Sequence, residues 1–151
     1  MSIPVRIISI KIFSEFMISI LFSIRQWLRI TLSLIYLSCI AFLSLLPSKD
    51  FPQLPMFAGA DKVVHTVMYM GLTILACWSM HAESKHKWYF LVFLFAVSWG
   101  ITMEIFQFIM HQGRSFEVFD IVANSIGALI GLSIYYFLSL LKHRINPTRG
   151  R

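Results

Sequence analysis

The chain has 151 residues, of which 58% are hydrophobic and only 13% are charged, and its formal net charge is +6. A soluble domain of this length has too little interior to bury so much apolar surface, so the composition favours an integral membrane protein. The basic residues lie at the ends of apolar segments rather than in one cluster, which argues against nucleic acid as a partner.

The first 26 residues are predicted to form an amphipathic or interfacial leader. Arg6, Lys11 and Glu15 interrupt its apolar stretch, whereas the core of a signal peptide is uncharged and is followed by a cleavage site. On a helix, polar residues gather on one side and apolar residues on the other, which is typical of a helix in the membrane interface. An additional span, or a start of translation at Met17, are the alternatives.

Four apolar segments follow the leader. They predict an all-α polytopic membrane protein, a bundle of four transmembrane helices with an additional N-terminal interfacial helix. The four-helix domain is expected over residues 27–141, before a basic cytoplasmic tail over residues 142–151. The expected spans are residues 27–46, 63–80, 88–110 and 118–141.

Three single residues in these segments carry expectations of their own. Arg29 is expected to reach the interface from the end of the first span. Cys39 and Cys77 are expected at different depths, too far apart for a disulfide, and to act as small buried hydrophobes.

Polar residues recur at helical spacing near one end of the second and third spans. Asp61, His65 and Tyr69 follow one another every four residues and share a helical face, with Lys62 beside them. On the third span the shared face carries Gly100, Glu104, Gln107 and His111. An acid such as Glu104 is costly in lipid, so it indicates a site. Gln107 is its expected hydrogen-bond partner.

The last span repeats this pattern. Asp120 and Asn124 share a face with Gly127 and Gly131, a GxxxG pair that predicts close helix packing within the bundle. Before this span, Arg114 is expected to reach back towards Glu104 or across to another acid. Glu117 is expected to be a solvated loop charge.

The distribution of basic residues predicts the topology. Ten of the 13 Lys and Arg residues fall on the side that holds both termini and three on the other, so the positive-inside rule places both termini in the cytoplasm. The polar residues then converge on the outer ends of three spans and predict an outward-facing polar pocket. Its expected members are Asp61, Lys62, His65, Tyr69, Glu104, Gln107, Arg114, Asp120 and Asn124.

This ordered set resembles the pattern of the VanZ-like family of bacterial membrane proteins. The matching pieces are Asp61-Lys62-x-x-His65-x-x-x-Tyr69, Glu104-x-x-Gln107 and Arg114-x5-Asp120-x-x-x-Asn124-x-x-Gly127, within about residues 30–141. The family takes its name from a protein associated with low-level resistance to the glycopeptide teicoplanin. The resemblance implies a multi-pass protein of the bacterial cytoplasmic (inner) membrane that acts at the cell envelope.

Three functional readings remain open. In the first, the pocket binds a membrane lipid, with Arg114 and Lys62 on the anionic head group of a lipid or cell-wall precursor. In the second, the protein is an intramembrane acid/base or metal-dependent hydrolase or transferase. Glu104 or His65 would then act as base, or His65, Glu104, His111 and Asp120 would hold a metal. In the third, the polar cluster is purely structural. With no recognised catalytic motif, we assign no catalytic residue, metal or cofactor.

Overall fold

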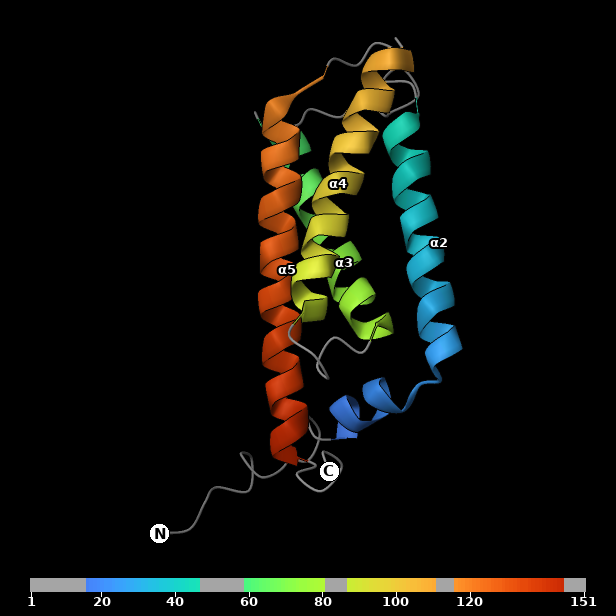
Figure 1. Cartoon of the computed structure of the whole chain (residues 1–151), viewed down its shortest axis with the longest axis vertical. Helices are drawn as coiled ribbons and strands as arrows, with labels where there is room; N and C mark the ends of the chain where they lie inside the picture. Colours follow the sequence, from blue (N-terminus) through green and yellow to red (C-terminus); the bar gives the residue numbers. More distant parts are fainter. Residues whose placement is uncertain (1–15, 47–58, 81–86, 111–115, 146–151) are drawn as a thin grey trace.

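The computed structural model describes residues 16–46, 59–80, 87–110 and 116–145, and these form helices and their ends (Figure 1). A short helix covers residues 16–23. Four long helices run alternately up and down the bundle, so that α2 begins and α5 ends at the same end. They are α2 (Gln26–Leu45), α3 (Ala60–Ser79), α4 (Lys87–Met110) and α5 (Val118–Ile145). The described chain is therefore all-helical, as predicted.

Three of the long helices are long and apolar enough to cross a membrane. They are Gln26–Leu45, Lys87–Met110 and Val118–Arg144, and they coincide with the first, third and fourth expected spans. α3 lies where the second span was expected but falls short of that apolarity. It contacts α2, α4 and α5, so less of its surface has to be apolar for lipid. The described residues thus contain three candidate spans rather than the expected four.

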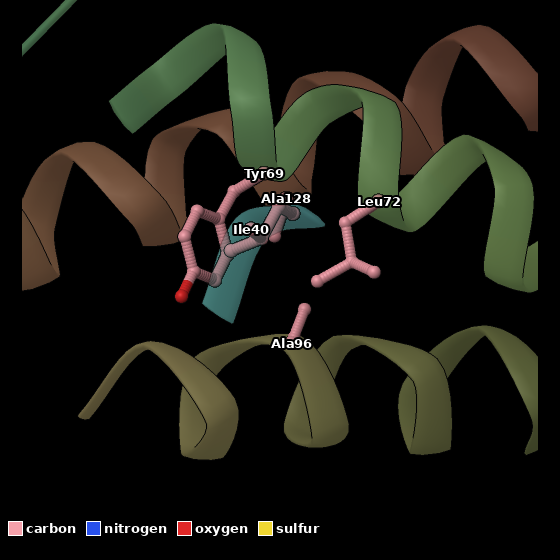
Figure 2. Packing of buried hydrophobic residues seen from close by; sticks show 5 residues of the cluster. All are labelled: Ile40, Tyr69, Leu72, Ala96 and Ala128. Carbon is pink, nitrogen blue, oxygen red and sulfur yellow. The ribbon is translucent and has the colours of Figure 1, made fainter. Parts of the chain in front are cut away.

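The closest helix contact in the bundle joins α3 and α5. A Cβ atom on Gly127 would lie 2.2 Å from the carbonyl oxygen of Thr66, and one on Gly131 would lie 2.6 Å from that of Met70. These glycines therefore let the two backbones touch, as small residues do between membrane helices. Beside this contact, Ile40 of α2, Leu72 of α3 and Ala96 of α4 are among the residues of the buried core (Figure 2).

Arg29 joins several segments at the end of the bundle where α2 begins. Only 2% of this residue is exposed, and its guanidinium donates to the carbonyl oxygens of Ile24 (2.9 Å), Phe22 (2.5 Å) and Trp78 (3.3 Å). It also lies 5.2 Å from the centroid of the Trp78 ring. The expectation that Arg29 reaches the interface was wrong, because the turn before α2 presents carbonyl groups that a buried guanidinium can satisfy.

The short helix over residues 16–23 lies across this end of the bundle (Figure 1). The indole nitrogen of Trp78 donates to the carbonyl oxygen of Leu21 at 3.0 Å. Phe22 packs near Tyr135 of α5, with Lys142 over its ring at 4.3 Å. This part of the predicted leader is therefore attached to the bundle, while residues 1–15 lie outside the described chain.

The two cysteines differ in their environment. Both are free, as expected, and Cys77 is buried beside Trp78. Cys39 is exposed on α2, so the expectation that it is buried was wrong. The reason is that the outer face of α2 contacts no other described helix at this position, and its apolar side chains are left for lipid.

Candidate functional site

The ends of three helices meet at the end of the bundle opposite Arg29. Because the helices alternate in direction, α3 and α5 begin where α4 ends (Figure 1). α3 starts after Gly59, whose φ of 88° is a left-handed conformation that glycine adopts without strain. Asp61 and Asp120 lie in the first turns of α3 and α5, where a negative charge is favoured by the helix dipole.

Lys62 is the centre of an ion-pair network. Its Nζ atom lies 2.5 Å from Oδ2 of Asp61 and 2.8 Å from Oδ1 of Asp120, and it also donates to Oε2 of Glu117. Asp61 and Lys62 precede the apolar stretch of α3. Hydrogen bonding to Asp120, and then to Asp61 and Glu117, raises the pKa of Lys62, while the bond from Lys62 lowers the pKa of Asp61. Lys62 is thus held as a cation by three carboxylates.

Glu117 lies in the loop before α5 and is partly exposed, as expected, but it also belongs to this network. Its side chain is 45% exposed and pairs with Lys62. Its backbone carbonyl accepts the first-turn N–H of Asp120 at 3.0 Å, so Glu117 stands at the start of α5. Its position three residues before Asp120 is the sequence signal that could have identified it.

His65 lies between α3 and α5 and faces two polar partners. Its Nδ1 atom is 3.0 Å from Oδ1 of Asn124, and its Nε2 atom is 3.5 Å from Oδ2 of Asp120. An amide oxygen can only accept, so Nδ1 is the donor in the first contact. The Nε2 atom is then the one directed towards the carboxylate of Asp120.

Glu104 is the most deeply buried acid of the cluster, with 1% of the residue exposed. Its Oε2 atom accepts the backbone N–H of Glu117 at 3.4 Å. Its Oε1 atom is buried and has no hydrogen-bond partner among the described residues. The expected bond from Gln107 is not the one formed, since Gln107 donates instead to the carbonyl oxygen of Ser44 on α2 at 2.8 Å.

Tyr69 lies one helical turn beyond His65 along α3. It is 1% exposed, and within the described chain its hydroxyl group has no hydrogen-bond partner. Gly100 of α4 makes room here, because a Cβ atom at this position would lie 2.9 Å from Asn124 Nδ2 and 3.3 Å from the Tyr69 ring. Tyr69 and Glu104 therefore add two unsatisfied buried oxygens to one region of the bundle.

The predicted pocket residues thus fall into three groups. Tyr69 lies one turn deeper than the cluster, and Gln107 turns towards α2. Arg114 and His111 lie outside the described residues. The structure brings the remaining predicted residues together with Glu117, and we call this set the polar cluster: Asp61, Lys62, His65, Glu104, Glu117, Asp120 and Asn124.

Exposure falls steadily from the rim of the polar cluster to its interior. The side chains of Asp61 and Lys62 are 54% and 30% exposed, those of His65 and Asp120 are 15% and 11% exposed, and Glu104 is buried. One ligand atom from each of His65, Glu104 and Asp120 lies within 4.8 Å of the other two. The arrangement can therefore exchange protons or hold a cation in its interior, behind a rim of exposed side chains.

Apolar helices of membrane-spanning length around a buried polar cluster define a helical membrane protein. The sequence profile of the VanZ/LLP1 family matches residues 13–139, so the chain belongs to this family. The family resemblance was therefore confirmed. The match begins within the predicted leader and so extends further than the resemblance itself did.

Among curated proteins, the chain is similar to the uncharacterized protein C11E3.10 of Schizosaccharomyces pombe (strain 972 / ATCC 24843). The two are 30% identical over 93 residues, which cover 62% of this chain and 54% of the yeast protein. The chain thus spans about half the length of this relative. No solved structure matches the chain. Since this relative is eukaryotic, the similarity is not restricted to bacterial proteins.

Proposed function

We propose that this VanZ/LLP1 family protein is a multi-pass protein of the bacterial cytoplasmic membrane with both termini in the cytoplasm. Arg25, Lys87, Lys142 and Arg144 lie at the end of the bundle where α2 begins, whereas Lys62 lies at the other end. The positive-inside rule assigns the first end to the cytoplasm. The polar cluster then faces the outer leaflet, and its function is to bind the head group of a lipid-anchored ligand.

The observation that carries this proposal is the unsatisfied carboxylate in the interior of the polar cluster. A buried charge that only holds helices together is stabilising when all of its hydrogen-bonding atoms are satisfied. Glu104 instead keeps Oε1 without a partner among the described residues, behind a rim of exposed side chains. This feature favours a ligand-binding site over a purely structural cluster.

The ligand chemistry follows from the surroundings of the polar cluster. Val63 and Val67 of α3 and Phe119 and Val122 of α5 are exposed apolar side chains next to it, with exposures from 47% to 73%. Such side chains accommodate an acyl or prenyl chain, and the polar cluster accommodates the head group. A phosphate on a lipid tail fits this division, and anionic lipids and lipid-linked cell-wall precursors share that chemistry.

Two lipids distinguish these sources: phosphatidylglycerol and a polyprenyl phosphate. We would purify the full chain in mild detergent and measure binding of each lipid by native mass spectrometry, for the parent and for Asp120→Asn. We expect the parent to retain one lipid class and the variant to lose it, because Asp120 positions Lys62, the cation that would face the phosphate. Ser133→Ala is the control, because Ser133 is exposed and bonds only to its own helix. Equal retention by parent and Asp120→Asn would contradict the proposal.

The envelope role makes susceptibility to teicoplanin the first phenotype to measure. We would express the parent and Asp120→Asn at equal levels in a susceptible bacterium and compare growth across a teicoplanin dilution series. Growth at higher drug concentration with the parent alone is the expected result. Identical growth curves would mean that the polar cluster does not affect teicoplanin susceptibility, whether or not it binds a lipid.

A second candidate function is hydrolysis or group transfer on the same lipid. The grouping of a basic imidazole nitrogen with two buried carboxylates favours this candidate, because general acid/base and metal-assisted reactions use such sets. Release of phosphate or head group from the two test lipids, measured with the parent and with Glu104→Gln, decides between binding and catalysis.

A further inference from the structure

We propose that His65, Glu104 and Asp120 bind a divalent metal ion, which supplies the positive charge that an anionic head group needs. The second half of this proposal rests on the proposed function, and the first half stands on the geometry of the three side chains. They come from α3, α4 and α5 respectively, so the ion would join the three helices at one point.

Each of the three side chains has one atom held by a neighbour and a second atom left for a ligand. Nδ1 of His65 is held by Asn124, Oδ1 of Asp120 lies beside Lys62, and Oε2 of Glu104 accepts the N–H of Glu117. The remaining atoms are Nε2, Oδ2 and Oε1. Neighbours that hold the second atom of each ligand in this way are typical of metal sites.

The contact between His65 and Asp120 requires a positive charge. With its proton on Nδ1, a neutral imidazole presents a lone pair on Nε2, and Oδ2 of Asp120 presents another at 3.5 Å. The positive charge at this contact is either a second proton on the imidazole, which Nε2 then donates to Asp120, or a metal ion bound between the two atoms. Ligand atoms about 2.1 Å from a tetrahedral ion lie roughly 3.4 Å apart, which agrees with the observed separation.

Glu104 provides an independent observation. It is 1% exposed, and no hydrogen-bond partner for its Oε1 atom occurs in the described part of the chain. A ligand atom of this residue lies within 4.8 Å of the ligand atoms of His65 and Asp120. A metal ion at this position would satisfy the carboxylate that is otherwise left unpaired in the interior of the bundle.

Charge explains why the head-group site needs this ion. Among the described residues of the polar cluster, Lys62 is the only Lys or Arg, and it pairs with the carboxylates of Asp61, Glu117 and Asp120. Glu104 adds a fourth acidic side chain to the polar cluster. This excess of negative charge among the described residues would repel a phosphate. One imidazole and two carboxylates suit Zn²⁺ or Mn²⁺, and three protein ligands leave coordination positions open for a phosphate oxygen.

Metal content tests the site without any lipid. We would load the purified full chain with Zn²⁺ or Mn²⁺, remove free metal, and measure the bound metal by mass spectrometry. We expect about one ion per chain for the parent, and a loss of most of it in Glu104→Gln, Asp120→Asn and His65→Gln. Glu117→Gln is the matched control, an acid of the same polar cluster outside the proposed ligand set.

Two results would overturn the metal site. One is a parent chain that binds no stoichiometric metal. The other is a Glu117→Gln variant that loses most of its metal while Glu104→Gln keeps it, which would place the ion at the more exposed group of Asp61, Glu117 and Asp120. Since variants can fail to fold, the parent loaded with Mn²⁺ gives a second test. Its electron spin echo spectrum should show one coordinated imidazole nitrogen, and the lack of this signal would also overturn the site.

The neighbour of the histidine gives a finer test. Asn124→Ala removes the acceptor that holds Nδ1 of His65, and such changes lower metal affinity about 10- to 100-fold. Unchanged affinity would contradict the role of Asn124. Lipid binding is measured separately, with and without metal. Metal binding without lipid binding would contradict the proposed function alone, and lipid binding by the metal-free chain would contradict the metal's role.

Discussion

The two ends of the bundle both bury charge, and they do so in opposite ways. At one end Arg29 donates to three backbone carbonyl groups that the local fold presents to it. At the other end Glu104 keeps a carboxylate oxygen without a partner in the described chain. A satisfied charge fixes structure, whereas an unsatisfied one costs stability and is retained where a ligand completes it. The comparison separates residues that hold the fold from residues available for function.

The largest effect is expected at the Arg29 end. Arg29→Met leaves the carbonyl groups of Phe22, Ile24 and Trp78 without their charged donor, and hydrogen bonds to charged groups contribute about 1.5–3 kcal/mol each. We expect a loss of about 4 kcal/mol or more, seen as a collapse of folded yield and of the thermal midpoint in mild detergent. Arg25→Met changes an exposed arginine nearby and should stay within about 0.5 kcal/mol. Equal losses of stability in the two variants would show that the buried hydrogen bonds of Arg29 do not stabilise the fold.

Lys62→Met should have the second-largest effect. Without this cation, Asp61, Glu117 and Asp120 face one another uncompensated. We expect a loss of about 1–2 kcal/mol, because the site is partly exposed and water screens the repulsion. Denaturant unfolding of the detergent-solubilised protein measures it, and added salt should recover part of the loss. A loss that does not depend on salt would mean that packing of the lysine stem matters more than its charge.

Glu104→Gln tests the comparison most directly. The change affects a buried acid of which one oxygen has no partner among the described residues, so the thermal midpoint should stay unchanged or rise by the equivalent of up to about 1 kcal/mol. Gln107→Leu is the matched control on the same face of α4. This variant loses the hydrogen bond to Ser44, so its free energy of unfolding should fall by about 1 kcal/mol. A larger loss for Glu104→Gln than for Gln107→Leu would make the acid architectural.

The smallest effect is expected at the rim. The side chain of Asp61 is 54% exposed, so Asp61→Asn should change the free energy of unfolding by less than about 0.5 kcal/mol. The same denaturant titration measures it. A loss as large as that of Lys62→Met would mean that the exposed Asp61 stabilises the fold as much as Lys62 does.

The helices could be predicted from sequence because long apolar stretches between polar turns leave few alternatives. The faces could also be predicted, since Glu104 and Gln107, and likewise Asp120 and Asn124, are buried as their spacing indicates. Partners could not be predicted in the same way. Helical periodicity places Gln107 on a buried face but does not say that the end of α2 lies opposite it.

Two residues show what further information was needed. Arg29 reads as an interfacial cation in the sequence, and its true role depends on the turn that brings residues 22 and 24 within reach. Glu117 reads as a loop charge, and its role depends on Lys62, which lies 55 residues away in the sequence. The Glu117 contact forms only after distant segments pack, and two of the Arg29 contacts depend on a local turn; helical spacing encodes neither.

The packing of the short helix over residues 16–23 against α5 has a consequence for how the protein assembles during synthesis. Phe22 contacts Tyr135 and Lys142 of α5, which the ribosome makes after α2, α3 and α4. The short helix can therefore complete its packing contacts only after α5 has been inserted. α5 also carries Asp120, which belongs to the polar cluster at the other end of the bundle. Insertion of α5 therefore completes both the contacts of the short helix and the polar cluster, and a chain interrupted before α5 would have neither.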